Sequence, residues 1–263
     1  MAGTEKSPFF RRILLVNDDG IDSKGLALLT EIACRLSDDV WVVAPDEERS
    51  GASRSISLSQ PLRCKKLAER RFAIKGTPAD CVLLAVEVLL ADSRPSVVLS
   101  GINHGENLAD DMAYSGTSGA AMEAAEFGIP GIALSQIRES GQMPDFSAAA
   151  SHAEGLLRRL AHWEWEQGVA VNINFPPVSA EQVKGISVAP VGRRPRRPFH
   201  PTPGMDGRNV PFHWLRVDYA FELSVAPGSD LAAARDGSIS VTALRHNPTC
   251  DDANVKLRAL LQE

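Results

Sequence analysis

The chain has 263 residues, with 44% hydrophobic and 23% charged side chains and a formal net charge of −5 at pH 7. These proportions are ordinary for a globular protein and supply enough apolar material for a substantial core. The acidic balance argues against a stable complex with nucleic acid, because the overall charge repels a phosphate backbone.

The sequence shows no signature of export or of membrane insertion. Residues 1–12 contain no apolar core of a signal peptide, and no stretch approaches the about 18–20 apolar residues that a membrane span needs. The four cysteines form no CxxC pair, which favours a reducing compartment and argues against a zinc site. We therefore expect a cytoplasmic protein with no membrane partner, in which residues 1–11 form a disordered extension.

Apolar runs of strand length alternate with helical patterns over the first part of the chain. The predicted strands are residues 13–16, 40–43, 62–65, 72–75, 96–99, 132–134 and 169–173, and the predicted helices are residues 23–36, 77–90, 117–127 and 146–165. This alternation predicts an α/β fold of three layers, Rossmann-like, with a parallel-dominated sheet. We assign residues 12–189 to this core.

The C-terminal third has a different character. Residues 190–211 are rich in proline, arginine and glycine without periodicity, and strand-like segments follow at 216–221 and 238–243. We expect residues 190–245 to form an extended arm or hairpin that joins subunits. A C-terminal helix is expected within residues 246–263.

The basic run Arg193-Arg194-Pro195-Arg196-Arg197 lies inside this expected arm. One interpretation is a nucleic-acid patch. The acidic total of the chain favours the other, in which the run belongs to a solvated or intersubunit arm that helps to attract anionic substrates.

Two adjacent carboxylates follow the first predicted strand, in the run Leu14-Leu15-Val16-Asn17-Asp18-Asp19-Gly20. Like charges side by side repel each other, so the pair is tolerable when a cation lies between them or when water surrounds both. Open α/β sheets bind ligands outside the carboxyl ends of their strands, and hard cations such as Mg²⁺ or Mn²⁺ prefer oxygen ligands. The alternative is a solvated Asp-Gly turn. Sharing one cation requires a backbone turn, which Gly20 permits.

Polar residues also follow two other predicted strands, in residues 46–51 and 100–107. In a parallel sheet these groups meet the two aspartates at one edge. Ser50 and Asn103 then supply neutral oxygen ligands, although each taken alone is better explained as a loop hydroxyl and a turn residue. His104 either contacts a phosphate or is a solvated loop histidine.

The run Ser115-Gly116-Thr117 opens the third predicted helix. Unpaired N–H groups and the positive end of the helix dipole favour phosphate binding there. The alternative is that Ser115 or Thr117 serves as an ordinary N-cap, and both roles can coexist. This helix start is therefore a candidate site for a substrate phosphate.

Six motifs occur together and in one order along the chain: Leu15–Ile21 (LVNDDGI), Val43–Gly51 (VAPDEERSG), Lys75–Val82 (KGTPADCV), Ser100–Asn107 (SGINHGEN), Tyr114–Thr117 (YSGT) and Val171–Pro176 (VNINFP). In combination they resemble the SurE family of stationary-phase survival proteins, over about residues 12–245. The resemblance implies a Rossmann-like fold with a C-terminal hairpin exchanged between subunits, and phosphatase activity on nucleoside monophosphates. It implies metal ligation by Asp18, Asp19, Ser50 and Asn103, and phosphate contacts from Asn107, Ser115, Gly116 and Thr117.

We therefore expect a 5′-nucleotidase that uses one divalent cation, Mg²⁺ or Mn²⁺, to release phosphate from nucleoside 5′-monophosphates. Activity on 3′-nucleotides or polyphosphate is an expected side reaction, and the protein is expected to be a homodimer or homotetramer. Asp18 and Asp19 are the expected catalytic residues, first as ligands and also as a base or nucleophile.

Three other functions are alternatives to this one. The first alternative to the 5′-nucleotidase is a non-catalytic nucleotide or metal sensor. A phosphatase of the haloacid dehalogenase type needs an aspartate two residues before a second one, and Asn17 stands at that position before Asp19. A nicotinamide dehydrogenase is disfavoured because no GxGxxG follows the first predicted strand.

Overall fold

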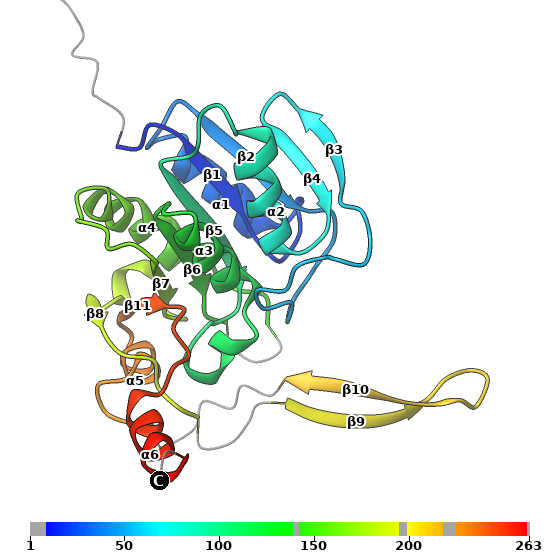
Figure 1. Cartoon of the computed structure of the whole chain (residues 1–263). Helices are drawn as coiled ribbons and strands as arrows, with labels where there is room; N and C mark the ends of the chain where they lie inside the picture. The colour runs from blue at the N-terminus through cyan, green and yellow to red at the C-terminus, as the bar shows by residue number, and fades with distance from the viewer. Residues whose placement is uncertain (1–8, 139–141, 195–198, 218–224, 262–263) are drawn as a thin grey trace, which may run out of the picture.

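The computed structural model describes residues 9–138, 142–194, 199–217 and 225–261, so most of the expected N-terminal extension lies outside the described residues. Figure 1 shows a large sheet flanked by helices, with a separate two-stranded hairpin. The strands are β1 (Ile13–Val16), β2 (Val40–Pro45), β3 (Arg63–Ala68), β4 (Arg71–Lys75), β5 (Val97–His104), β6 (Gly131–Gln136), β7 (Val169–Phe175), β8 (Ile186–Val188), β9 (Phe199–Met205), β10 (Pro211–Val217) and β11 (Ile239–Arg245).

The helices, including short 3₁₀ and π segments labelled η, are α1 (Lys24–Ala33), α2 (Pro78–Leu84), η1 (Ala85–Leu89), η2 (Ala109–Ala113), α3 (Gly116–Glu126), α4 (Ser147–Leu160), η3 (Ala180–Gln182), α5 (Asp230–Arg235) and α6 (Asp251–Leu261). Among the described segments, none of the helices combines the length and the apolarity that a bilayer crossing requires.

The main sheet has nine strands in the order β3-β4-β2-β1-β5-β6-β7-β11-β8. Strands β4, β2, β1, β5, β6 and β7 are all parallel to their neighbours within this run, whereas β3–β4 and β7–β11 are antiparallel. The expected α/β fold with a parallel-dominated sheet is therefore confirmed. Parallel pairing brings the carboxyl ends of β1, β2 and β5 to one edge, which positions the residues that follow them.

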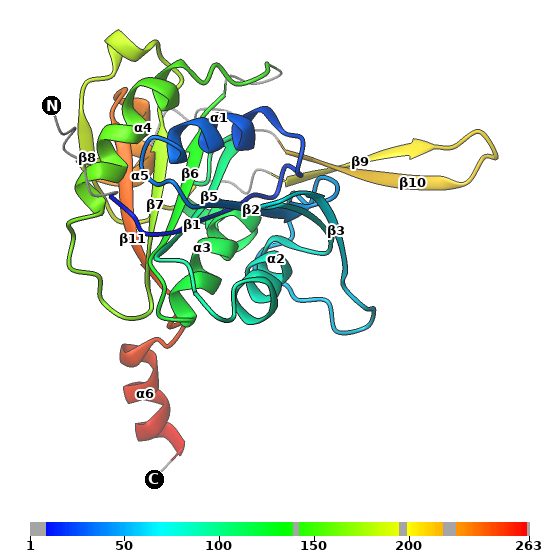
Figure 2. The same ribbon diagram turned by 90° about the horizontal axis from the view of Figure 1, so that it is seen from above.

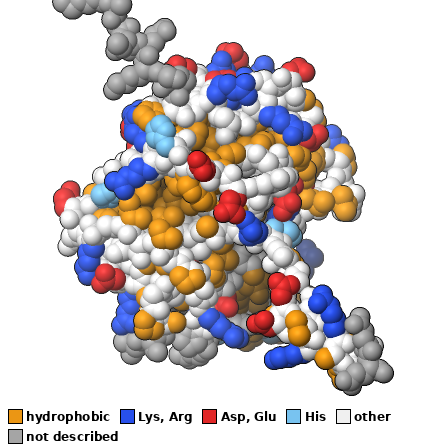
Figure 3. All heavy atoms as spheres, turned by 60° about the vertical axis from the view of Figure 1, so that its left-hand side comes forward, with side chains coloured by type: hydrophobic (Ala, Val, Ile, Leu, Met, Phe, Trp, Pro, Cys, Tyr) orange, Lys and Arg blue, Asp and Glu red, His pale blue; other side chains and the backbone are white. Residues whose placement is uncertain are grey.

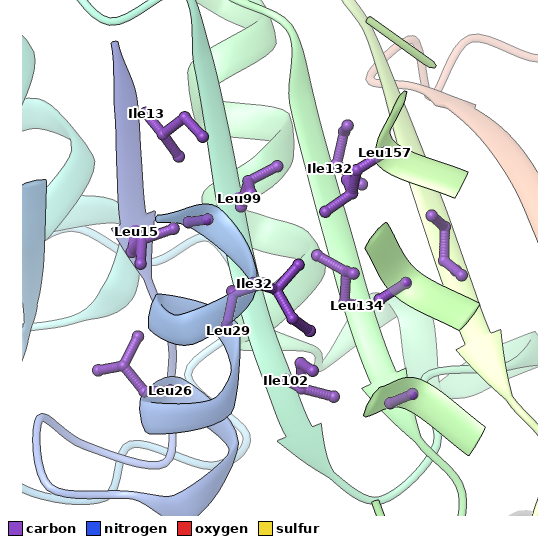
Figure 4. Close-up of a cluster of buried hydrophobic side chains, with 14 of the residues drawn as sticks. Ile13, Leu15, Leu26, Leu29, Ile32, Leu99, Ile102, Ile132, Leu134 and Leu157 are labelled. Carbon is purple, nitrogen blue, oxygen red and sulfur yellow. The ribbon is translucent and has the colours of Figure 1, made fainter. Parts of the chain in front are cut away.

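Both faces of the central strands β1, β6 and β7 are buried, and the side chains of β1 alternate between the two faces. Ile13 and Leu15 belong to the cluster covered by α1 and α4, whereas Leu14 and Val16 pack with residues of α2 and α3. Figure 2 shows these helix pairs on opposite sides of the strands, and Figure 4 shows Leu26, Leu29 and Ile32 of α1 packed on the first face. Continuous apolar strands such as 13–16 are typical of such doubly covered sheets.

Local signals determined several helix starts. Ser23 caps α1, and Thr77 forms a reciprocal capping box with Asp80 at α2. The expected helix of residues 146–165 ends earlier, at Leu160, because tight turns follow and Trp165 Nε1 donates to the Leu160 carbonyl at 3.3 Å.

Residues 100–104, which were expected to follow the predicted strand 96–99, lie inside that strand instead. Strand β5 continues to His104, with Asn103 opposite Ser135 of β6 after a register shift. The shift allows a polar segment to remain in the sheet, because β6 supplies the hydrogen-bond partners that a free loop would lack.

The expected arm of residues 190–245 is also corrected. Strand β11 joins the main sheet beside β7, and α5 packs Leu231 against Leu108 below it. Ile239 of β11 is buried there, with 2% of its surface exposed, and Val241 is partly buried against the same core. The strand joins at this place because the edge of β7 offers partners for its backbone hydrogen bonds. Among the described residues, the part that projects is the antiparallel hairpin of β9 and β10 (Figure 1). The predicted strand 216–221 ends at Val217 in β10, and its remainder lies outside the described residues.

Acidic and basic side chains are interspersed over the face of the molecule seen in Figure 3, rather than gathered into a continuous basic surface. Helix α6 is the expected C-terminal helix and begins at Asp251. It stands away from the sheet in Figure 2, and Val255, Leu257 and Leu260 are exposed along it.

Candidate functional site

A tight turn follows β1 and orients the two aspartates. The Asn17 amide nitrogen donates to the Gly20 carbonyl at 2.9 Å and to the Ser23 hydroxyl at 2.8 Å. Gly20 has φ +92°, a left-handed conformation in which a side chain is strained, and a Cβ there would lie 3.2 Å from the Glu47 backbone. The turn needed for Asp18 and Asp19 to share one ligand is therefore present.

Asp18 is buried, with 4% of its surface exposed, against the first turn of α3. Its Oδ1 accepts a hydrogen bond from the Thr117 hydroxyl at 2.6 Å, and its Oδ2 accepts one from the Thr117 backbone N–H at 3.2 Å. This approach requires glycine at 116, because a Cβ there would lie 2.9 Å from both Cβ and Oδ2 of Asp18. Burial raises the pKa of Asp18, and the bonds from Thr117 oppose that rise.

Asp19 is held on the opposite side, against the end of β5. Its Oδ2 accepts a hydrogen bond from the His104 backbone N–H at 3.2 Å, and the His104 ring Nδ1 lies 3.7 Å from Oδ1. Burial, followed by the charge of Asp18, raises the pKa of Asp19 to about 7. The turn therefore gathers two carboxyl groups whose negative charges are poorly compensated by the protein itself.

His104 is not a solvated loop residue. It lies in β5, its ring packs edge-on against Phe146 with centroids 5.5 Å apart, and burial is the largest cause that lowers its pKa. A neutral imidazole beside Asp19 does not supply the missing positive charge.

Ser50 and Asn103 lie on the two segments next to this pair. The loop that carries Ser50 is attached to the turn by the Arg49 N–H, which donates to the Asp18 carbonyl at 2.7 Å. The Ser50 hydroxyl is exposed and donates to Glu48 Oε1 at 2.8 Å. Asn103 precedes His104 and donates from Nδ2 to the Gly105 carbonyl at 3.0 Å. The structure thus brings both segments to the turn that carries the aspartates.

Asn107 is the most firmly held residue of the expected phosphate site. Its backbone N–H donates to Asn174 Oδ1 at 2.8 Å, and its side-chain nitrogen donates to the Ser135 hydroxyl at 2.8 Å. Its carbonyl accepts from the side chains of Asn172 at 2.8 Å and Asn174 at 3.0 Å. Because all of these groups are buried, the position of Asn107 is rigidly determined.

The start of α3 matches the capping interpretation. The Ser115 hydroxyl accepts the Ser118 N–H at 3.0 Å, as an N-cap does, and the Thr117 hydroxyl is used by Asp18. The helix has 11 residues, and its first turn faces Asp18, so a phosphate there would lie beside the carboxylates.

The sequence interpretation missed the asparagines of β7 as supports for Asn107. Asn172 and Asn174 occupy a strand whose seven residues are all buried. Two asparagines in an otherwise apolar strand could have indicated a buried hydrogen-bond network, because buried amides require hydrogen-bond partners.

Arg194 was also misjudged, because it is not solvated. Its guanidinium is 8% exposed and lies 2.7 Å from Asp111 Oδ2 and 3.5 Å from Glu106 Oε1. Its backbone N–H donates to Asp110 at 2.8 Å. Burial raises the pKa of Asp111 and brings that of Glu106 to about 7, while the arginine opposes both shifts. This buried cluster ties the chain before the hairpin to Glu106 and to η2, in the segment that leads from Asn107 to Ser115.

These features define a Rossmann-like α/β protein with an acidic site at the carboxyl edge of its sheet, beside a helix N-terminus. The model of the Survival protein SurE family matches residues 13–198, and the chain belongs to this family. The resemblance of the sequence motifs is thereby confirmed.

Named relatives match nearly the whole chain. The 5′-nucleotidase SurE of Azorhizobium caulinodans is 43% identical over 256 residues, covering 95% of this chain and 99% of the relative. That of Parvibaculum lavamentivorans is 45% identical over 258 residues, covering 95% and 92%. The crystal structure of the SurE protein from Aquifex aeolicus superposes with a TM-score of 0.80 at 34% identity, covering 95% of this chain and 99% of that one.

Proposed function

We propose that this chain hydrolyses nucleoside 5′-monophosphates to a nucleoside and phosphate. Relatives named 5′-nucleotidase SurE match it at 43–45% identity over nearly their whole length, which makes it a phosphoric monoester hydrolase. The observation that carries the proposal is the contact between Thr117 at the start of α3 and the buried carboxylate of Asp18. Oxygen ligands for a cation and a helix start suited to phosphate thereby lie side by side.

A single divalent cation, Mg²⁺ or Mn²⁺, fits the donors of this site. Burial and mutual repulsion raise the pKa values of Asp18 and Asp19, and a cation would compensate both charges. Within the described residues, no group of three or more His, Cys, Asp or Glu is arranged to hold a metal ion. The proposed set therefore completes two carboxylates with neutral oxygens of Ser50 and Asn103, and leaves positions for water and substrate.

When bound, such a cation polarises the phosphoryl oxygens and stabilises the charge that develops as the ester bond breaks. The residues of the chain position the substrate. The N-terminus of α3 attracts the phosphate, Thr117 holds the Asp18 carboxylate in place, and the buried asparagine network fixes the position of Asn107.

Nucleoside 5′-monophosphates are expected to be cleaved with a higher kcat/KM than p-nitrophenyl phosphate at the same Mn²⁺ concentration. Binding energy from the base and ribose can orient the phosphate, whereas the aryl ester offers neither group. Phosphate release should be measured for both, and for 3′-nucleotides, sugar phosphates and polyphosphate, with and without a chelator. A kcat/KM for p-nitrophenyl phosphate that equals or exceeds the kcat/KM for nucleoside 5′-monophosphates would indicate a general phosphatase. Failure of every substrate to turn over would favour the sensor hypothesis.

We also propose that the hairpin joins subunits into a homodimer or homotetramer. Trp214 and Leu215 are 68% and 71% exposed on β10, and solvent-exposed apolar strands invite pairing with another chain. Phe199 and Val217 are partners across the hairpin ladder, so a short Gly-Ser link can replace residues 200–216 without disturbing α5.

This deletion is expected to shift the protein towards monomer, as measured by light scattering after size-exclusion chromatography. A matched variant, Trp214→Ser with Leu215→Ser, keeps the hairpin and should move the mass in the same direction. A wild-type protein that is monomeric at tens of micromolar, or a deletion that keeps the wild-type mass, would contradict the role of the hairpin.

A further inference from the structure

A hollow of about 750 Å³ lies beside the candidate phosphate site and has no part in the chemistry described above. Its walls come from η2, from the segment before the hairpin and from the first residue of β9, with Met112, Tyr114, Val191, Arg193 and Phe199 among its lining residues. This volume lies within the range of pockets that hold small organic ligands.

Residues that line the hollow are next to the phosphate site in the chain or are hydrogen-bonded to its loops. Tyr114 immediately precedes Ser115, the N-cap of α3. The Ser53 N–H donates to the Tyr114 carbonyl at 3.0 Å and the Ser53 hydroxyl to the Ala113 carbonyl at 2.9 Å, which attaches this wall to the loop that carries Ser50. A phosphate bound at the start of α3 would therefore have its ester substituent close to this opening.

The lining suits a flat aromatic group. The rings of Tyr114 and Phe199 meet edge to face, with centroids 4.9 Å apart and an interplanar angle of 77°, and Tyr114 remains 42% exposed. Met112 adds a polarisable thioether on the same wall, and Arg193 adds a guanidinium. Aromatic faces and guanidinium planes are the groups on which proteins stack nucleobases.

We propose that this hollow binds the nucleoside part of the substrate, with the base against Tyr114. The proposal rests on the proposed 5′-nucleotidase function and adds Tyr114 as a specificity-determining residue for that reaction. Because Phe199 begins the hairpin, the position of the hairpin base would also shape the nucleoside subsite.

Adenosine, which has the nucleoside part and no phosphate, provides a test that does not depend on turnover. Its binding should be measured by calorimetry with the full chain, its Tyr114→Ala and Tyr114→Phe variants, and Trp163→Ala as the control. Trp163 is a comparably exposed aromatic residue, at 38%, and it packs against Trp165 after α4. We expect Tyr114→Ala to weaken binding about 5- to 150-fold, as measured for loss of base stacking on an aromatic ring. Tyr114→Phe and Trp163→Ala should bind like the wild type.

The kinetic readout separates this proposal from the proposed function. Tyr114→Ala should lower kcat/KM for adenosine 5′-monophosphate by a similar factor and leave that for ribose 5-phosphate within about twofold, because the second substrate has no base to stack on Tyr114. Adenosine binding that is absent in the wild type or unchanged in Tyr114→Ala would overturn the subsite, and so would an equal loss on both substrates. Adenosine binding that depends on Tyr114, without hydrolysis of the monophosphate, would support the subsite and overturn the proposed function.

Discussion

The Asp19→Asn variant is expected to lose metal-dependent phosphate release while its metal-free form unfolds at a higher temperature than the wild type. Removal of a carboxylate from a site with two of them should cost several kcal/mol of transition-state stabilisation, or about 10²- to 10⁴-fold in rate. Without metal, the same change relieves the repulsion between Asp18 and Asp19 that contributes to raising the Asp19 pKa to about 7.

The gain in unfolding temperature of metal-free Asp19→Asn is expected to increase with pH. The pKa of Asp19 rises from 3.8 to about 7 on folding, so the fold disfavours the charged carboxyl. Its destabilising effect is absent well below pH 4, grows between about pH 4 and pH 7, and is constant above the pKa of the folded state. The increase in Tm of Asp19→Asn over the metal-free wild type should therefore be larger at pH 8 than at pH 5.

Asp18→Asn is expected to lose activity as well, without the same gain in stability. Both Asp18 oxygens accept hydrogen bonds from Thr117, and an amide nitrogen cannot replace an acceptor. Asp22→Asn provides the control, because Asp22 is exposed and lies in the same loop. Phosphate release and Tm should be measured with and without Mn²⁺. Retention of most wild-type turnover by both site variants, or the same Mn²⁺-induced rise in Tm as the wild type, would refute the ligand assignment.

Arg194→Met is expected to destabilise the fold by about 3–5 kcal/mol, because it leaves two buried carboxyl groups without their cationic partner. Asp111 and Glu106 already have raised pKa values, and protonation at low pH removes the uncompensated charge. The loss should therefore be larger at pH 8 than at pH 5. Denaturant unfolding at the two pH values measures it.

Lys184→Met is a matched control for this variant. Its ammonium lies 2.9 Å from Asp236, but the two side chains are 62% and 64% exposed, and an exposed pair contributes about 0–1 kcal/mol. An Arg194→Met protein as stable as this control at pH 8 would show that the buried cluster does not stabilise the fold. Since the cluster holds the segment between Asn107 and Ser115, its loss should also raise KM for nucleotides.

Much of the fold follows from signals that act over a few residues. The uninterrupted apolar run 13–16 indicates a strand buried on both faces, and Ser23 and Thr77 mark helix starts through their own hydroxyl groups. The polar residues after β1 and β5 could likewise be placed at one sheet edge, because parallel strands end on the same side. Six motifs in order were also sufficient to indicate the family.

Other features depend on partners that are distant in the chain. The residues around Arg194 have the composition of a solvated arm. Arg194 is nevertheless buried, because Asp111, 83 residues earlier, lies beside it in the fold. Strand β11 completes the main sheet because the edge of β7 is open, which no local pattern in residues 239–245 indicates.

The sequence by itself therefore determined most strands and helices of the core and which polar groups gather at the strand ends, since periodicity and capping are local. Only the tertiary structure decided how those groups are held. Asn107 depends on Asn172 and Asn174 of a strand 65 and 67 residues further on, and Asp18 depends on Thr117, 99 residues away. Buried polar groups need partners wherever the fold brings them together, and the spacing of residues along the chain does not contain that information.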